Sequence, residues 1–426
     1  MKTKHLIILL TFFVFKSQPL HSQGWSAVGT GMNANVQTLT SYNGEICAGG
    51  NFTSAGGNSA NEIAKWNGIN WSNLAGGMNW TVSALTVYNS NLYAGGWFST
   101  PASYIAKWNG TAWSALGTGM NGKVYSLAVY NGELYAGGEF SIAGGVSAQY
   151  IAKWNGSTQV WSTVGTGIGN VVYALAVYNG ELYAGGGPAP YIAKWNGTTW
   201  STVGTGVNGY IFSFAVDPVN NVLYAGGSFS TAGGITVNNI ARWNGSNWSA
   251  LGNGTNNSVR ALTFNNGELF IGGFFTMAGG IFANYIAKWN GTIWSPLGTG
   301  MNNKVNALNI YGTDLYAGGD FTTAGGANAM YIAKYSIPTT GINLLENQKN
   351  INVHPNPSSG YFTFSSVGKQ KINSILIYDN TGKVILTYEV NDFEFKLDMK
   401  KYSSGIYYYR TIDQEGNSTN GKIINE

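Results

Sequence analysis

The feature that most constrains the fold is a repeat that fills most of the chain. Each copy opens with Trp-Ser, and successive openings lie 39 to 48 residues apart. One full copy runs from Trp113 to Gly156. The seven openings are Trp25, Trp71, Trp113, Trp161, Trp200, Trp248 and Trp294. Periods in this range predict a stacked or circular array of similar units.

Short apolar runs and tight-turn dipeptides alternate within one copy. The copy at Trp113 predicts strands over 124–130, 133–140 and 150–154, and a fourth strand that begins at Trp161. Asn131-Gly132 separates the first two strands, and both residue types tolerate the positive φ of a two-residue hairpin turn. The pattern indicates a four-stranded antiparallel sheet in which nearly every strand is buried.

A Gly-Gly pair ends the second strand of the unit. In the copy at Trp113 the pair is Gly137-Gly138, and it follows the sequence Leu-Tyr-Ala. Glycine inside a strand pattern indicates close approach of another backbone or side chain. We therefore expect the pair to lie where a larger residue would obstruct packing.

The two ends of the repeat region complement each other. The first copy begins at Trp25 with only an outer strand, whereas the last stops at Tyr335 after its third strand. Pairing of residues 25–31 with the last copy would give seven complete sheets without a free edge. We therefore predict an all-β chain in which residues 24–337 form a seven-bladed β-propeller closed by its N-terminal strand.

The same residues resemble a known family of repeats. The double glycine after an aromatic residue in 134–138, the aromatic Trp154 and the Trp that opens the next strand resemble the kelch repeat, including the kelch-type propeller of galactose oxidase. The repeats are also similar to those of fungal cortical polarity-marker proteins. The resemblance covers residues 25–337 and implies a propeller, a fold that hosts many unrelated activities.

The first 22 residues predict a secretory signal peptide. Lys2 and Lys4 precede an apolar run over 6–15, and polar residues follow. The run is shorter than the roughly 20 residues of a membrane-spanning helix. No later stretch is apolar enough to span, so we expect a mature chain that is exported and has no transmembrane segment.

The repeat stops after Tyr335. Residues 338–350 are predicted to form a linker, and residues 351–426 a second domain whose alternating apolar residues indicate a small β-sandwich. Its motifs resemble the C-terminal sorting domain of the type IX secretion system, which implies a Bacteroidetes-type bacterium, passage through the periplasm and release or attachment at the outer cell surface. The motif residues are Pro355, Asn356, Pro357, Gly360, Gly382 and Gly405.

The propeller region contains no histidine, because the three histidines are His5, His21 and His354. This excludes histidine-based nucleophilic triads, His-rich metal sites and the copper chemistry of galactose oxidase there. We expect no metal and no cofactor. The modest net charge of +4 predicts no nucleic-acid partner. The single cysteine, Cys47, is interpreted as a small buried apolar residue.

Carboxylates are the remaining candidates for catalysis. Five of the nine in the propeller share one position after the first hairpin turn, where pairing with lysines of the third strand, such as Lys153 and Lys194, is expected. Asp217 lies in an altered version of that turn, and Glu62, Glu139 and Asp320 remain. A glycosidase needs two carboxyl groups roughly 5–10 Å apart. Glu139 and Asp320 belong to different blades, so we expect no enzyme.

The position directly after Gly-Gly varies while its neighbours barely change, which indicates an exposed surface tuned copy by copy. We predict that the rim formed by the second-to-third-strand and outer-to-inner connections is the working face, because loops that vary in length carry recognition. Exposed aromatic residues there suit sugar rings or a protein partner. The candidate ligand-binding residues are Trp80, Trp97, Glu139, Phe274, Met277, Phe282 and Asp320.

The sequence therefore favours a secreted or cell-surface, non-enzymatic propeller that binds a glycan or a surface protein through one rim. Its other expected partner is the type IX secretion machinery, through the C-terminal domain. Two alternatives stay open at this point. One is a polysaccharide-cleaving enzyme that uses Glu62, Glu139 or Asp320, and the other is a purely structural surface protein.

Overall fold

The computed structural model describes residues 24–337, 351–366, 371–379, 384–414 and 418–426. The chain divides into two compact units at Ile337. The described residues contain only strands and connections, so none of them forms a helix that could cross a membrane. The predicted signal peptide (1–22) and linker (338–350) lie outside the described residues.

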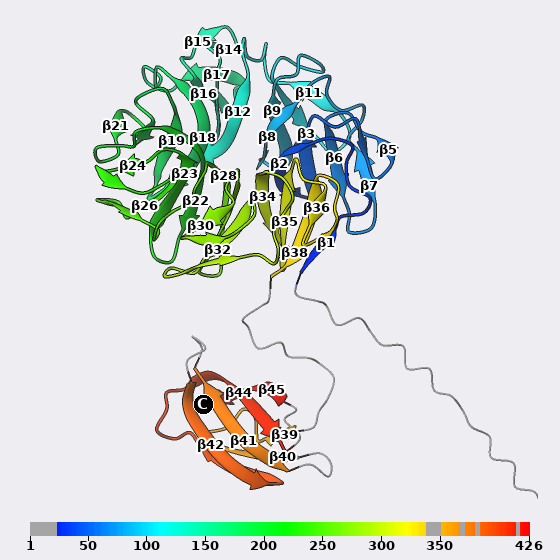
Figure 1. The fold of residues 1–426 in the computed structure, drawn as a ribbon, viewed down its shortest axis with the longest axis vertical. Helices are drawn as coiled ribbons and strands as arrows, with labels where there is room; N and C mark the ends of the chain where they lie inside the picture. The colour runs from blue at the N-terminus through cyan, green and yellow to red at the C-terminus, as the bar shows by residue number, and fades with distance from the viewer. Residues whose placement is uncertain (1–23, 338–350, 367–370, 380–383, 415–417) are drawn as a thin grey trace, which may run out of the picture. The chain divides into compact units, whose positions relative to one another are not determined.

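The larger unit is a ring of seven four-stranded antiparallel sheets (Figure 1). This confirms the predicted seven-bladed β-propeller. We number the blades along the chain, so that blade 1 is β2-β3-β6-β7 and blade 7 is β34-β35-β38-β1, from the innermost strand outward.

The two inner strands of each blade are joined by a tight turn. In blade 3 the turn is Asn131-Gly132, whose φ angles of 49° and 74° fit the predicted two-residue hairpin. The innermost strands are β2 (Val36–Tyr42), β8 (Val82–Tyr88), β12 (Val124–Tyr130), β18 (Val171–Tyr178), β22 (Tyr210–Asp217), β28 (Val259–Asn265) and β34 (Val305–Tyr311). The second strands are β3 (Glu45–Gly50), β9 (Asn91–Gly96), β13 (Glu133–Gly138), β19 (Glu181–Gly187), β23 (Val222–Ser228), β29 (Glu268–Gly273) and β35 (Asp314–Gly319).

The two outer strands are shorter. The third strands are β6 (Ile63–Trp66), β10 (Ile105–Trp108), β16 (Ile151–Asn155), β20 (Ile192–Trp195), β26 (Ile240–Trp243), β32 (Ile286–Trp289) and β38 (Ile332–Ser336). The outermost strands are β7 (Trp71–Asn73), β11 (Trp113–Ala115), β17 (Val160–Thr163), β21 (Trp200–Thr202), β27 (Trp248–Ala250), β33 (Trp294–Pro296) and β1 (Trp25–Ala27). The third strand begins one residue later than predicted in blade 3, because Tyr150 has a φ of 70°, outside the extended region.

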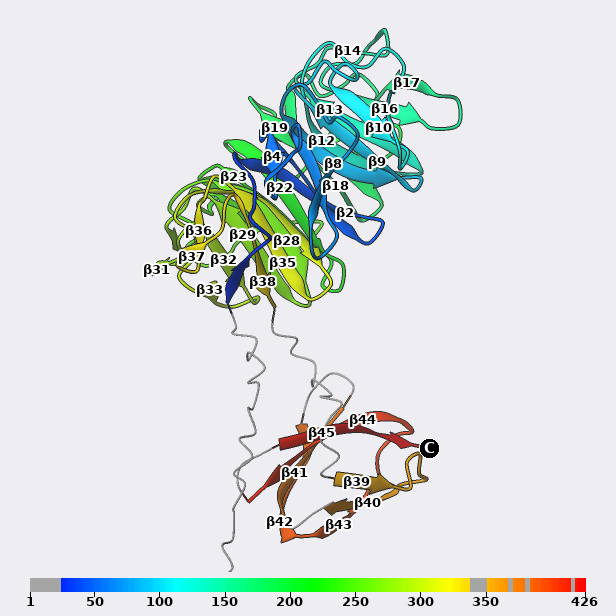
Figure 2. The same cartoon turned by 90° about the vertical axis from the view of Figure 1, so that its right-hand side faces the viewer.

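Closure of the ring follows the predicted pairing. Strand β1 lies antiparallel to β38, with Trp25 opposite Tyr335 and Ala27 opposite Ala333. Figures 1 and 2 show the blue N-terminal strand at the edge of the last blade, next to β38. The strand is shorter than the predicted 25–31, since its pairing ends at Ala27. The rings of Trp25 and Tyr335 pack 5.3 Å apart between centroids. The N-terminal strand therefore completes blade 7.

A hydrogen bond from each outermost Trp ties every blade to the one before it. The indole Nε1 donates to a backbone carbonyl just after the outermost strand of the preceding blade, over 2.8–3.1 Å. The seven pairs are Trp25–Leu297, Trp71–Val28, Trp113–Leu74, Trp161–Leu116, Trp200–Val164, Trp248–Val203 and Trp294–Leu251. Because these carbonyls are satisfied by the next blade, the interaction runs around the whole ring.

The Gly-Gly pair of the second strand packs against two neighbours, as the sequence predicted. A Cβ on Gly137 would collide with Val172 of the next blade, and a Cβ on Gly138 would collide with the carbonyl oxygen of Lys123 in the same blade. The equivalent glycines of the other six blades meet the same two obstacles. The first glycine thus permits close packing of blades, and the second permits a close approach of the innermost strand.

Each innermost strand carries a β-bulge near its start. In blade 3 the register against β13 shifts between Val124 and Ser126, which leaves Tyr125 unpaired. The corresponding unpaired residues of blades 1 to 7 are Gln37, Ser83, Tyr125, Tyr173, Phe212, Arg260 and Asn306. Side chains along a strand alternate between the two faces of the sheet, and a bulge interrupts this alternation and redirects the side chain of the extra residue. We call these seven the bulge residues.

Five blades carry a small hairpin between their second and third strands. The hairpins are β4 (Ser54–Ala55) with β5 (Asn58–Ser59), β14 (Ile142–Ala143) with β15 (Val146–Ser147), β24 (Thr231–Ala232) with β25 (Ile235–Thr236), β30 (Met277–Ala278) with β31 (Ile281–Phe282), and β36 (Thr323–Ala324) with β37 (Ala327–Asn328). In the described propeller, blades 2 and 4 have none, in line with their shorter sequence. The rim that carries the connections between the second and third strands therefore differs from blade to blade.

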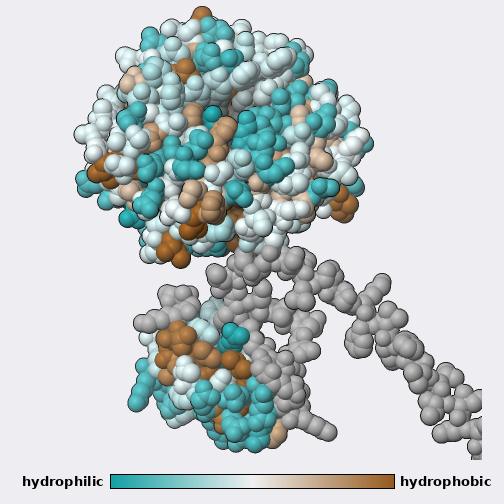
Figure 3. Space-filling view, in the orientation of Figure 1, coloured by the Kyte–Doolittle hydropathy of each residue, from teal (hydrophilic) through white to brown (hydrophobic). Residues whose placement is uncertain are grey.

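The smaller unit is a sandwich of two antiparallel sheets. One sheet contains β39 (Ile351–His354), β40 (Tyr361–Ser366) and β43 (Glu394–Asp398), and the other contains β42 (Val384–Asp392), β41 (Ile372–Tyr378), β44 (Gly405–Asp413) and β45 (Ser418–Asn425). Phe364 of the first sheet packs edge-on against Tyr409 of the second, with ring centroids 4.9 Å apart. Figure 3 shows apolar surface gathered on one side of this unit.

The motif residues of the tail hold its last strand. The Asn356 side chain donates to the Lys422 carbonyl at 2.8 Å and accepts from the Ile424 amide at 2.9 Å. Pro355 and Pro357 flank it. Gly360 has a φ of 104° beside Lys400, where a Cβ would collide. Gly405 begins β44, and Gly382 lies outside the described residues.

Candidate functional site

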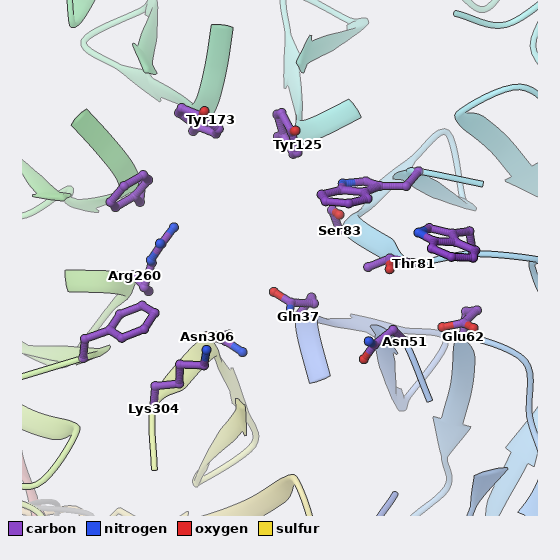
Figure 4. Close-up of a pocket in the computed structure, with 14 residues that line it drawn as sticks. Gln37, Asn51, Glu62, Thr81, Ser83, Tyr125, Tyr173, Arg260, Lys304 and Asn306 are labelled. Carbon is purple, nitrogen blue, oxygen red and sulfur yellow. The ribbon is translucent and has the colours of Figure 1, made fainter. Parts of the chain in front are cut away.

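A cavity of about 750 Å³ lies at the centre of the propeller and is lined by fourteen residues (Figure 4). All seven bulge residues are among them. Each blade therefore contributes one side chain from the same structural position. The volume lies within the roughly 300–1,000 Å³ of typical ligand sites.

The other seven lining residues come from the connections that follow the second strands or precede the innermost and third strands. They are Asn51, Glu62, Trp80, Thr81, Trp97, Phe274 and Lys304. Three of them directly follow a Gly-Gly pair, and three precede an innermost strand. The cavity is thus built at the rim that carries the second-to-third-strand and outer-to-inner connections.

Aromatic side chains form a continuous arc along the cavity wall. Tyr125 lies 6.4 Å from Trp97 and 5.1 Å from Tyr173 between ring centroids. Tyr173 in turn lies 5.7 Å from Phe212. These separations are those of interacting aromatic pairs. We call Trp97, Tyr125, Tyr173 and Phe212 the aromatic arc.

A cationic side chain lies next to the ring at each end of the aromatic arc. The Lys123 ammonium lies 4.3 Å from the Trp97 ring centroid. At the other end, the Arg260 guanidinium lies 3.9 Å from the Phe212 centroid and 5.0 Å from the Phe274 centroid. Cations within about 6 Å of a ring face are attracted to it. The aromatic arc thus has a positive charge at each end.

The carboxylates of Glu139 and Asp320 each form a hydrogen bond with a lining side chain and an ion pair with a lysine. Tyr125 donates to Glu139 at 2.6 Å, and Lys123 lies 3.3 Å from the same oxygen. The pKa of Glu139 is lowered mainly by the hydrogen bond from Tyr125. The hydrogen bond from Lys123 lowers it further. Burial and this hydrogen bond raise the pKa of Tyr125, so its hydroxyl keeps its proton at neutral pH.

Asp320 is held in the same manner in blade 7. It accepts a hydrogen bond from Asn306 Nδ2 at 2.7 Å and lies 3.1 Å from the Lys304 ammonium. The interaction fixes Asn306 and Lys304, which both line the cavity. Glu139 and Asp320 therefore orient lining side chains.

Glu62 differs from these carboxylates because it has no paired cation. It lines the cavity, and its Oε2 atom is buried without a hydrogen-bond partner. Burial raises the pKa of Glu62 to about 7. At neutral pH, a substantial fraction of Glu62 is consequently a neutral acid that can donate a proton or a hydrogen bond.

Arg260 and Lys304 are the cations among the described lining residues, and of the two only Lys304 has an ion-pair partner there. The Arg260 Nε atom is buried and has no hydrogen-bond partner. Burial lowers the pKa of the Arg260 guanidinium, but a guanidinium keeps its charge at neutral pH. Figure 4 shows Arg260 reaching into the cavity from the side opposite Glu62.

The residues that the sequence singled out fall into three groups. Trp80, Trp97 and Phe274 line the cavity. Glu139 and Asp320 lie behind lining residues and bond to them. Met277 and Phe282 lie opposite each other on the hairpin of β30 and β31 and are not among the lining residues.

The sequence interpretation missed the bulge residues. Their position, directly after a Val or Ile near the start of the innermost strand, holds Gln, Ser, Tyr, Tyr, Phe, Arg and Asn in the seven copies. The residues on either side of it vary much less. The same signal of local variation that drew attention to the position after Gly-Gly was thus also present here.

Metal and thiol chemistry have little support in the described residues. No group of three or more His, Cys, Asp or Glu side chains lies close enough there to hold a metal ion. Cys47 is buried, and burial raises the pKa of its thiol to about 12. A buried neutral thiol is a poor nucleophile, which agrees with its interpretation as a packing residue.

Comparison with known proteins identifies the tail. Residues 352–426 match the family described as secretion system C-terminal sorting domain. The predicted type IX sorting domain is thereby confirmed, and it indicates export to the cell surface or secretion by interaction with that machinery. The periplasmic route and the Bacteroidetes origin stay predictions. No curated protein sequence matches the chain.

Solved structures resemble the chain in fold. PorZ, an essential bacterial surface component of the type-IX secretion system of Porphyromonas gingivalis, matches with a TM-score of 0.50 at 15% identity, over 92% of this chain and 59% of PorZ. The chain thus spans less than two thirds of PorZ. A GH74 enzyme of Niastella koreensis matches with a TM-score of 0.47 at 14% identity, over 93% of this chain and 74% of the enzyme. At such identities the likeness concerns fold alone, and the kelch resemblance stays a prediction.

Proposed function

We propose that this protein is a non-enzymatic glycan-binding propeller that acts at the cell surface or after secretion, and that the central cavity is its binding site. The observation that carries the proposal is the composition of the cavity wall. An aromatic arc from blades 2 to 5 faces the polar side chains of Gln37, Asn51 and Asn306 on blades 1 and 7, and Ser83 on blade 2 adds a hydroxyl group.

A sugar requires both kinds of surface. The faces of its rings are apolar and stack on aromatic side chains, while its hydroxyl groups need donors and acceptors in fixed positions. Asn306 is held by Asp320, and Tyr125 is held by Glu139. Polar groups that are oriented before binding lose little conformational entropy when a ligand arrives.

The occupied carboxylates support a binding role over a catalytic one. A glycosidase needs a free acid and a free base or nucleophile on either side of the glycosidic bond. Glu139 and Asp320 each pair with a lysine and accept a hydrogen bond from a residue that lines the cavity. Among the described residues that line the cavity, Glu62 is the one with a carboxyl group, and its Oε2 has no hydrogen-bond partner there.

Binding of a panel of neutral and acidic oligosaccharides to the full chain, measured by calorimetry, tests the proposal. We expect at least one oligosaccharide to bind, and the double change Trp97→Ala with Tyr173→Ala to weaken it by about 10- to 100-fold, because each stacking partner contributes roughly 1–2 kcal/mol. Phe282→Ala is the control, since Phe282 is 81% exposed but lies outside the cavity lining. Equal losses in both variants, or no binding, would contradict the proposal.

A polysaccharide-cleaving activity is the second candidate, and Glu62 is the observation that favours it. A buried carboxyl group with a pKa of about 7 suits a general acid at neutral pH. The same oligosaccharides, incubated with the protein and analysed for products, separate the two candidates. We expect no products. Product release that Glu62→Gln abolishes would favour the enzyme.

A protein partner is the remaining outcome of this experiment. If no oligosaccharide binds but a surface protein does, and the Trp97 and Tyr173 changes weaken that interaction, the cavity is a protein-binding site. Binding of a protein that is insensitive to these changes would place recognition elsewhere on the propeller.

A further inference from the structure

We propose that the glycan bound in the cavity is acidic, and that Arg260 binds its carboxylate or sulfate group. The inference rests on the proposed function and names the chemical class of its ligand. It is carried by the contrast between Arg260 and the lysines around the same cavity.

The lysines already have anionic partners. Lys123 lies 3.3 Å from Glu139, and Lys304 lies 3.1 Å from Asp320. Arg260 has neither an ion pair nor a hydrogen bond to any described residue, and its Nε is buried without a partner. A cation in this state has lost part of its hydration without replacement. A ligand anion would restore that interaction.

Two aromatic rings fix the orientation of the guanidinium. Phe212 and Phe274 lie 3.9 Å and 5.0 Å from it. These rings contain no hydrogen-bond acceptor atom, and no described residue accepts a hydrogen bond from the guanidinium, so its N–H donors are available to a ligand. The guanidinium presents paired N–H donors that match the two oxygens of a carboxylate or two oxygens of a sulfate. A lysine at this position would offer no such planar fork.

The surroundings allow an anion to approach. Figure 4 places Glu62 on the opposite side of the cavity from Arg260, and burial raises the pKa of Glu62 to about 7, so a substantial fraction of Glu62 is uncharged at pH 7. Tyr173 neighbours Phe212 at 5.7 Å between ring centroids. An aromatic face for a sugar ring and a cation for its acidic substituent therefore lie side by side.

The test compares each acidic oligosaccharide with its neutral counterpart. Oligomers of galacturonate, mannuronate and guluronate are paired with carboxyl-reduced forms, and sulfated galactan oligomers with desulfated forms. Calorimetry with the full chain is expected to show at least one acidic oligomer binding about 10-fold or more tightly than its neutral form, as expected for hydrogen bonds to a charged group. The series that binds identifies carboxylate or sulfate as the recognised group.

Variants assign the effect to Arg260. Arg260→Gln is expected to weaken binding of the acidic oligomer by about 10- to 100-fold and to leave the neutral form unaffected. Arg260→Lys, which keeps the charge but loses the fork, is expected to be intermediate. Arg242→Gln is the matched control, because Arg242 lies on the third strand of blade 5 and contacts Ser249. Thermal unfolding checks that each variant is folded.

The outcomes distinguish the inference from the proposed function. Neutral oligomers that bind as tightly as acidic ones, with binding that still depends on Trp97 and Tyr173, would overturn the inference and leave glycan binding in place. Acidic oligomers that bind the folded Arg260→Gln variant like the wild type would also overturn it. Absence of binding by every oligomer would overturn both.

Discussion

At the scale of single residues, Glu62 is the most unusual group in the propeller. The other copies hold Tyr104, Tyr150, Tyr191, Asn239, Tyr285 and Tyr331 at its position, directly before the third strand. Glu62 has a φ of 65°, as most of its equivalents do. The backbone at this position is thus common to the repeat, whereas the carboxyl group is specific to blade 1. A carboxyl group whose Oε2 lacks a partner destabilises the fold when it is ionised.

Glu62 should make the stability of the propeller depend on pH. Its pKa rises from 4.5 in the unfolded chain to about 7 in the folded one, so between these values the folded state binds more protons. Stability therefore falls as pH rises from about 4.5 to 7, by about 1–3 kcal/mol. Glu62→Gln should remove this loss.

Urea unfolding followed by tryptophan fluorescence measures the effect, because all 15 Trp residues lie in the propeller. The quantity compared is the free energy of unfolding of Glu62→Gln minus that of the wild type. We expect this difference to be larger at pH 8 than at pH 4.5 by about 1–3 kcal/mol, in favour of the variant. A difference between the two proteins that is the same at both pH values would show that burial does not raise the pKa of Glu62.

At the scale of elements, the inner hairpin of each blade couples packing to recognition. The second glycine of the pair allows the innermost strand to approach the second strand. The bulge near the start of the innermost strand turns one side chain toward the cavity. The sequence predicted the glycine's role, since a missing side chain in a strand indicates close contact. It did not predict the bulge, because a bulge is a shift of register between two strands and leaves no residue signature of its own.

Gly138→Ala tests this coupling in blade 3. Its Cβ would collide with the Lys123 carbonyl, so the strands must separate, at a cost of about 2–4 kcal/mol. The same movement should displace Tyr125 and weaken glycan binding. Ser147→Ala, on the exposed hairpin of the same blade, is the control for urea unfolding and calorimetry. Stability and affinity equal to those of the control would show that the glycine is not required there.

At the scale of the whole molecule, closure of the ring creates the site. Trp25 and Tyr335 meet across the closure, and the bulge residues of all seven blades then surround one cavity. The blade number and the closure were predictable, because the copies can be counted and the two ends supply complementary strands. The sorting tail was predictable from its motifs. The aromatic arc was not, because Trp97, Tyr125 and Tyr173 become neighbours only when the blades are arranged in a circle.

The structure of the full chain in complex with the tightest-binding oligosaccharide of the panel tests the central claim most directly. We predict that the sugar lies in the central cavity, with a ring against Tyr125 or Tyr173 and its acidic group at the edge of Arg260. An oligosaccharide bound on the opposite rim, or on the outer faces of the blades with the cavity free of ligand, would contradict this account.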